Sequence, residues 1–193
     1  MARKIKAVIL DRDGTVIAEK NYLNRVRDVS LLRGAAAALA ELRRAGYLLI
    51  VATNQSGVAR GYLDEKKLNA INRKVIRLLA DRGVDIDAVY YCPHPVDGGC
   101  ACRKPATGMI DAAIKKFRFD PKLSFCVGDK ITDIEFGHNA GMKSVMVLTG
   151  HGAEELAEAK RSRLTRARRK SRPDFAARDL AEAAEWIIAQ TTL

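Results

Sequence analysis

The sequence predicts an α/β fold built on an open, doubly wound and mostly parallel β-sheet. Short apolar runs rich in β-branched residues alternate along the chain with longer amphipathic segments, and this alternation is typical of βαβ units. A length of 193 residues is enough to bury one sizeable core, and no internal repeat or low-complexity linker divides the chain. We therefore predict one domain that spans residues 1–193.

The predicted strands are short apolar runs that end in polar turn residues, as expected for buried strands. They cover residues 5–10, 47–54, 86–92, 123–129 and 143–150. The predicted helices follow these strands in alternation, and most are rich in Ala, Leu and charged residues. They cover residues 34–47, 63–83, 108–117, 133–141 and 177–190.

Local signals indicate where two of the helices begin and end. Asp64 is expected to cap the start of the helix over residues 63–83. Gly46 and Gly83 are expected to end the first and second helices. Trp186 lies on the apolar stripe of the last helix, and we interpret it as a core residue rather than a ligand contact.

The apolar runs and the N-terminal residues bear on where the protein works. The longest apolar runs, such as residues 47–52, are far too short to span a bilayer. The first residues lead directly into the first predicted strand and leave no room for a signal peptide. We expect a cytoplasmic protein without a membrane partner.

The formal net charge of +11 arises mostly from one stretch near the C-terminus. Residues 160–172 hold eight Lys or Arg and no acidic residue, and without them the net charge is +3. Such a run can contact an anionic partner. No aromatic residue is interleaved with the basic ones, which disfavours single-stranded nucleic acid. We interpret residues 152–172 as a basic, solvated helical segment.

Four polar clusters follow predicted strands, three of them directly and one within a long polar segment after the third strand, and each alone could serve as a turn, a cap or a solvated surface. They are Asp11 and Asp13; Thr53 and Asn54; Arg103 and Lys104; and Asp129, Lys130 and Asp133. In open parallel sheets, ligands bind at the carboxyl ends of the strands. Four clusters at these ends therefore indicate one shared site.

The chemistry of these clusters suits a phosphoryl group and a cation. Asp11, Asp13 and Asp129 can gather a hard cation, for which Mg²⁺ is expected in a phosphate site. A hydroxyl, an amide and two cationic side chains can surround a phosphoryl group. An Asp carboxylate can also attack phosphorus, and a second Asp two residues later can reach the same substrate and transfer a proton.

The segments LDRDGT, TNQSG, CRKP and VGDKITD resemble, in this order, the four motifs of the haloacid-dehalogenase-type phosphatases. The resemblance covers residues 5–149 and implies a Rossmann-like sheet. It implies that Asp11 is the nucleophile and that Asp13 is the general acid and then the base. It also implies Mg²⁺ bound by the Asp11 carboxylate, the Asp13 carbonyl and Asp129.

The same resemblance assigns the remaining polar residues. Thr53 and Lys104 are implied to bind and stabilise the transferred phosphoryl group. Asp133 is implied to act indirectly, by orienting Lys104 or a water molecule bound to the metal. The residues between the motifs are accounted for by strands and helices, so we expect no separate cap domain over the site.

A second cluster, within residues 92–102, has the spacing C-x-H-x₅-C-x-C. Cys92, His94, Cys100 and Cys102 match the Cys₃His ligand set of structural zinc. The alternative is a set of buried cysteines with an unrelated histidine. The loop is rich in Gly and Pro and leads into the Arg103–Lys104 pair, so a bound zinc would hold both cations in place. Cys126, in a predicted strand, is interpreted as a small core residue.

The zinc loop resembles that of the D-glycero-D-manno-heptose 1,7-bisphosphate 7-phosphatases, a branch that shares it with the histidinol-phosphate phosphatases. The sequences ARGY, GDK and the GM that follows CRKP favour the heptose branch. This resemblance implies substrate contacts by Glu19, Lys20, Asn21, Tyr22, Asn54, Gln55, Ser56, Arg103 and Lys130.

We therefore expect a Mg²⁺-dependent phosphatase that removes the 7-phosphate of a heptose bisphosphate during the synthesis of nucleotide-activated heptose for lipopolysaccharide or other surface glycans. Histidinol phosphate is the alternative substrate within the same subgroup. A 3′-phosphorylated nucleic-acid end is the alternative that the basic stretch favours. The chain is expected to act as a monomer on a small phosphorylated sugar.

Overall fold

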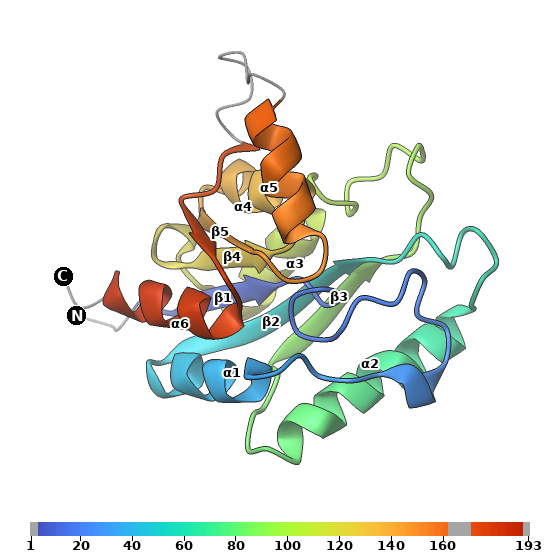
Figure 1. Ribbon diagram of the computed structural model, residues 1–193, viewed down its shortest axis with the longest axis horizontal. Helices are drawn as coiled ribbons and strands as arrows, with labels where there is room; N and C mark the ends of the chain where they lie inside the picture. The colour runs from blue at the N-terminus through green and yellow to red at the C-terminus, as the bar shows by residue number, and fades with distance from the viewer. Residues whose placement is uncertain (1–3, 162–170, 191–193) are drawn as a thin grey trace.

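The computed structural model describes residues 4–161 and 171–190 (Figure 1). In this part of the chain, one parallel sheet has the strand order β3-β2-β1-β4-β5-β6. The strands are β1 (Lys6–Leu10), β2 (Tyr47–Asn54), β3 (Ala88–Cys92), β4 (Phe125–Gly128), β5 (Lys143–Val147) and β6 (Phe175–Ala177). From β1 the chain adds strands outward in one direction through β2 and β3, and then in the other direction through β4, β5 and β6. This arrangement confirms the predicted doubly wound sheet.

Helices cover both faces of the sheet. They are α1 (Ala35–Arg44), α2 (Glu65–Ala80), α3 (Gly108–Phe117), α4 (Ile131–Asn139), α5 (Gly152–Arg161) and α6 (Leu180–Ala189), with short 3₁₀ turns η1 (Val26–Asp28) and η2 (Pro121–Leu123). Helices α1, α2 and α6 pack on one face, and α3 and α4 pack on the other (Figure 1). Because successive side chains of a strand point to opposite faces, Val8 joins the first cluster and Ile9 joins the second.

The predicted helix signals are confirmed. Asp64 caps α2, since its side chain accepts a hydrogen bond from the backbone N–H of Lys67 at 2.7 Å. Gly46 and Gly83 follow α1 and α2 with φ values of 86° and 74°, a region that favours glycine. Trp186 is partly buried and packs against the core, and its ring stacks on Phe175 with a centroid distance of 5.1 Å.

Most predicted elements differ from the structure by up to three residues at an end, and two differences have a clear physical reason. Strand β6 was not predicted, because three residues flanked by charged and polar residues carry too little periodicity; it forms by pairing with β5. Helix α4 begins at Ile131 rather than at residue 133, because the Asp133 side chain accepts a hydrogen bond from the Lys130 backbone N–H at 3.0 Å. The predicted helical segment over residues 152–172 includes α5, and residues 162–170 lie outside the described residues.

The chain leaves the carboxyl ends of the strands accessible. Between β1 and α1 it forms only a loop with η1, and β3 and α3 are joined by a second loop; both lie beyond these strand ends (Figure 1). The described residues form no separate cap domain over this edge, as predicted. None of the described helices has the length and hydropathy of a membrane span.

Candidate active site

A cavity of about 650 Å³ at the carboxyl ends of the strands brings the predicted site residues together. The predicted residues that line it are Asp11, Asp13, Glu19, Asn21, Tyr22, Thr53, Asn54, Gln55, Ser56, Arg103, Lys104, Lys130 and Asp133. Asp129 is fully buried, with a carboxylate oxygen within 4.8 Å of one from Asp11. Lys20 does not line the cavity; it is exposed, and its backbone N–H donates to Glu19 Oε1 at 2.9 Å.

The nucleophile predicted by the motifs, Asp11, is held by the sheet. Its backbone N–H donates to the Val127 carbonyl at 2.8 Å, which extends the pairing of β1 with β4 by one residue. The Gln55 backbone N–H donates to the Cys92 carbonyl at 2.7 Å in the same way, one residue after β2. Both side chains therefore stand on rigid strand ends rather than on free loops.

Lys104 forms a buried ion pair with two carboxylates. Its Nζ atom lies 2.5 Å from Asp11 Oδ1 and 2.6 Å from Asp133 Oδ1, and it donates to the Ala52 carbonyl at 2.9 Å. Burial lowers the pKa of Lys104, but Asp11 and Asp133 outweigh this effect and raise it above its ordinary value. The ammonium group therefore stays charged next to Asp11, where it can neutralise a phosphoryl group.

Asn54 fixes the backbone that carries this lysine. The Asn54 side chain accepts a hydrogen bond from the Lys104 N–H at 3.0 Å and donates one to the Lys104 carbonyl at 3.2 Å. Both polar ends of the amide are thus used on the backbone of one residue. The sequence-based expectation for Asn54 was a substrate contact, and the structure gives its side chain this internal contact.

Asp11 and Asp129 form the side-chain part of a site for a hard cation. Burial raises the pKa of Asp11 to about 7, against the lowering effect of Lys104, and burial raises that of Asp129 to about 6. Asp129 Oδ2 accepts a hydrogen bond from the His151 N–H at 2.8 Å, whereas no described residue hydrogen-bonds its buried Oδ1. Two buried carboxylates that cluster in this way call for a compensating cation, so the residues fit Mg²⁺.

The backbone around Asp129 is shaped for close approach. A Cβ atom at Gly14 or at Gly150 would lie 2.2 Å from Asp129 Oδ2, which is far inside van der Waals contact. Both glycines have positive φ values, of 83° and 56°. The glycine that follows the two aspartates in the first motif thus lets the loop turn against the third carboxylate.

Asp13 is held on one of its two carboxylate oxygens. Its Oδ2 accepts hydrogen bonds from Arg12 Nη2 at 2.8 Å, Arg12 Nε at 3.1 Å and Gln55 Nε2 at 2.9 Å. The same Gln55 amide donates to Thr53 Oγ1 at 2.9 Å. Sequence reasoning missed Arg12 and its partner Asn72. The only sequence signal for Arg12 was a basic residue between the two aspartates of the first motif.

The mouth of the cavity combines aromatic and charged side chains. Tyr22 packs edge-to-face on Tyr62 at 4.8 Å, and the Arg60 guanidinium lies over the Tyr22 ring at 5.5 Å. Glu19 Oε2 lies 3.9 Å from both Lys130 Nζ and His151 Nε2. Arg60 and His151 also line the cavity and were not predicted as site residues. Arg60 belongs to the ARGY segment, which served only to favour the heptose branch, and His151 lies outside the recognised motifs.

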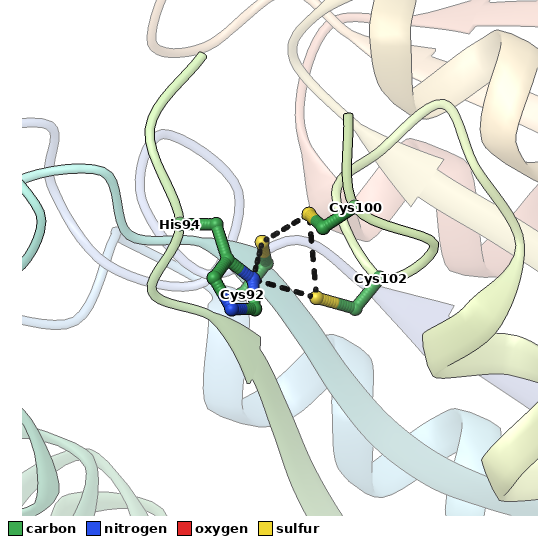
Figure 2. Close-up of side chains that lie close together, drawn as sticks. All are labelled: Cys92, His94, Cys100 and Cys102. Carbon is green, nitrogen blue, oxygen red and sulfur yellow. Dashed lines mark hydrogen bonds between the residues drawn. The ribbon is translucent and has the colours of Figure 1, made fainter. Parts of the chain in front are cut away.

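The predicted metal cluster is assembled from two segments, the end of β3 and the loop before α3 (Figure 2). The contacts Cys92 Sγ–His94 Nδ1, Cys92 Sγ–Cys100 Sγ, His94 Nδ1–Cys102 Sγ and Cys100 Sγ–Cys102 Sγ measure 3.5, 3.5, 3.2 and 3.6 Å. A tetrahedral zinc ion with Zn–S bonds of about 2.3 Å needs ligand atoms about 3.5–3.8 Å apart. Three of the four contacts lie in this range, and the contact between His94 and Cys102 is slightly shorter. The cluster therefore fits a structural zinc ion.

The thiols differ in how readily they ionise. Burial raises the pKa of Cys92 to about 12. Burial also opposes ionisation of Cys100, but hydrogen bonds from Cys92 and the Arg103 backbone outweigh it and lower the pKa of this thiol to about 6. All four cysteines are free, and Cys126 is buried in β4, as predicted for a core residue.

The zinc cluster is physically continuous with the cavity. Cys100, Arg103 and Lys104 line it, and Arg103 Nη1 donates to the His94 carbonyl at 3.4 Å. A metal that joins the two segments thus holds the chain immediately before the lysine that contacts Asp11.

Comparison with known proteins agrees with this geometry. The family model described as haloacid dehalogenase-like hydrolase matches residues 17–141, and the model described as HAD-hydrolase-like matches residues 101–183. The D-glycero-beta-D-manno-heptose-1,7-bisphosphate 7-phosphatase of Pasteurella multocida is 44% identical over 152 residues, which cover 75% of this chain and 83% of the relative. A D-glycero-alpha-D-manno-heptose-1,7-bisphosphate 7-phosphatase of Photorhabdus laumondii is 41% identical over 163 residues, which cover 80% and 89%.

A solved structure extends the likeness to the whole fold. The crystal structure of the D,D-heptose 1,7-bisphosphate phosphatase from B. bronchiseptica, complexed with magnesium and phosphate, superposes with a TM-score of 0.85 and 36% identity. The match covers 97% of this chain and 100% of that one. Taken together with the two relatives and the four motifs at one cavity, this likeness shows that the chain belongs to the haloacid dehalogenase-like hydrolases and, within them, to the family of D-glycero-D-manno-heptose-1,7-bisphosphate 7-phosphatases.

Proposed function

We propose that this chain hydrolyses the 7-phosphate of D-glycero-D-manno-heptose 1,7-bisphosphate. The observation that carries the proposal is the Asp11 carboxylate at the cavity floor, paired with the buried ammonium group of Lys104 at 2.5 Å. The names of the relatives, which include both anomers of the substrate, support the choice of sugar.

In the first step, a carboxylate oxygen of Asp11 attacks phosphorus, and the bond from phosphorus to the C7 oxygen breaks. The product is an aspartyl-phosphate, and Asp13 gives its proton to the departing alkoxide. In the second step, Asp13 takes a proton from water, the water oxygen attacks phosphorus, and the carboxylate of Asp11 is regenerated. The net reaction consumes one ester and one water and releases one alcohol and one phosphate.

Charge neutralisation is assigned to residues around Asp11. Lys104 and the Thr53 hydroxyl stabilise the transferred group, and Asp133 positions Lys104 through its 2.6 Å ion pair. Mg²⁺, held by Asp11, Asp129 and the Asp13 carbonyl, supplies further positive charge against the phosphoryl oxygens when it is bound. Zinc in the cysteine cluster serves structure, because its four protein ligands leave no open position.

The rest of the substrate is assigned to the mouth of the cavity. Arg103 and Lys130 carry the positive charge that a second, distal phosphate requires. Glu19, Asn21 and Tyr22, together with residues 54–56, form the walls around the sugar. We further propose that residues 1–193 form one domain that acts as a monomer in the cytoplasm, where metal-binding cysteines remain reduced.

Phosphate release tests the proposal. The wild-type protein with Mg²⁺ is assayed on both anomers of the heptose bisphosphate, on histidinol phosphate and on a 3′-phosphorylated oligonucleotide, with Asp11→Asn as the control for contaminating phosphatase. We expect the highest kcat/KM on a heptose anomer. A higher value on histidinol phosphate or on the oligonucleotide would overturn the substrate assignment and leave the catalytic residues in place.

A further inference from the structure

We propose that Arg12 and Asn72 are positioning residues that set the orientation of the Asp13 carboxylate for proton transfer. Asn72 on α2 holds the Arg12 guanidinium, Arg12 holds one oxygen of Asp13, and the other oxygen is left to exchange the proton. This inference rests on the proposed function, since it concerns the proton-transfer step of that reaction.

The first observation is the burial of Arg12. Its side chain is only 1% exposed and is among the largest fully buried side chains of the described residues. A guanidinium group is always charged in proteins, and taking such a charge out of water is expensive unless its partners compensate it. Its placement between the two catalytic aspartates therefore points to a role that a neutral side chain could not fill.

The second observation is the direction of the guanidinium hydrogen bonds. Nε and Nη2 both donate to Asp13 Oδ2, at 3.1 and 2.8 Å, while Nη1 donates to Asn72 Oδ1 at 2.6 Å. Because the guanidinium is planar and its donors have a fixed geometry, fixing Nη1 also fixes the other two. Asn72 is itself 6% exposed, and it ties the motif loop to a helix sixty positions further along the chain.

The third observation is the unequal use of the two Asp13 oxygens. Oδ2 accepts three hydrogen bonds, from two Arg12 atoms and from Gln55, whereas none of the described residues hydrogen-bonds Oδ1. An oxygen that already accepts three donors is poorly placed to carry a proton. The proton that Asp13 exchanges is therefore carried by Oδ1, and the Arg12 fork determines where this buried oxygen points.

The consequence is a dependence on the leaving group. An alkoxide such as the sugar C7 oxygen needs a proton as it departs, and a positioned general acid contributes about 10²–10⁴-fold to such a step. A p-nitrophenolate leaves without that proton. A carboxylate that is free to rotate should thus impair hydrolysis of alkyl phosphates far more than hydrolysis of p-nitrophenyl phosphate.

The test compares kcat/KM on the heptose bisphosphate and on p-nitrophenyl phosphate, since kcat/KM reports the step in which the ester bond breaks. Asn72→Leu removes the acceptor for Arg12, and Asn72→Asp keeps it. Val75→Ala is the matched control, because Val75 is also buried on α2 and its apolar side chain cannot hydrogen-bond to Arg12. We expect Asn72→Leu to lower the alkyl-to-aryl ratio of kcat/KM by at least about tenfold, Asn72→Asp to restore it, and Val75→Ala to leave it unchanged.

An equal loss of kcat/KM on both substrates in Asn72→Leu would overturn the inference, because it would show only a structural role. Failure of the wild-type protein on the heptose bisphosphate would count against the proposed function alone. The ratio is then measured with histidinol phosphate or another alkyl phosphate that the wild-type protein hydrolyses, so the two failures remain distinguishable.

Discussion

The substitution Lys104→Met removes the charge that lets two buried carboxylates share one site. The Lys104 side chain is 3% exposed, and those of Asp11 and Asp133 are 9% and 2% exposed. Removing one partner of a buried ion pair costs about 3–5 kcal/mol of stability. In a domain of this size, about 1 kcal/mol corresponds to roughly 2–4 °C in Tm. We therefore expect Tm in magnesium-free buffer to fall by roughly 6–20 °C.

The loss of stability caused by Lys104→Met should be larger at higher pH. Burial raises the pKa of Asp11 from 3.8 to about 7 even while Lys104 lowers it, so the substitution raises this pKa further. A carboxyl group with a raised pKa in the folded state destabilises the fold above its unfolded pKa, and the penalty grows until the pH exceeds its folded pKa. The difference in Tm between variant and wild type should therefore be larger at about pH 8 than at about pH 6.

Thermal unfolding followed by circular dichroism at these two pH values measures both effects. Lys4→Met is the matched control, because the Lys4 side chain is 71% exposed in its ion pair with Asp120 and should contribute little. A Tm within about 2 °C of wild type at about pH 8, or an equal loss at both pH values, would refute the reasoning that Lys104 compensates buried charge.

Three further outcomes are expected. Asp11→Asn should lower turnover at least about a thousandfold while the circular dichroism spectrum is retained, because the nucleophile is lost; substantial remaining turnover would contradict its assignment. Cys100→Ala should release zinc and lower activity through the loop that carries Lys104, and metal analysis that still finds one zinc per chain would show that the ligand set is wrong. Mg²⁺ affinity, measured by calorimetry, should fall as the pH falls from about 8 to about 5.5, since burial raises the pKa of Asp11 to about 7 and that of Asp129 to about 6 and both must ionise to bind the cation; an affinity that does not change with pH would argue against these two ligands.

Much of the fold follows from local signals in the sequence. The strand over residues 47–54 and the helix over residues 108–117 match β2 and α3 residue for residue, because apolar periodicity and turn residues act over short distances. The Asp64 cap and the glycines at the helix ends follow from local signals in the same way. Strand β6 does not, since its three residues become a strand only through their partners on β5.

The candidate site also combines residues that could be found from the sequence with contacts that only the structure shows. Asp11, Asp13, Asp129 and the zinc cluster could be found from the sequence, because residue type and spacing restrict the chemistry that such groups can perform.

Only the tertiary structure showed which partners keep these groups charged and fix their orientation. The pairing of Lys104 with Asp11 and Asp133 joins residues 93 and 29 positions apart, and the hold of Asn72 on Arg12 spans 60 positions. Hydrogen bonds and ion pairs act over a few ångströms in space and leave no periodic trace along the chain. The sequence alone therefore predicted which side chains take part in the chemistry, and the packing of α2 and of the zinc loop onto the strand ends determined how these side chains are oriented.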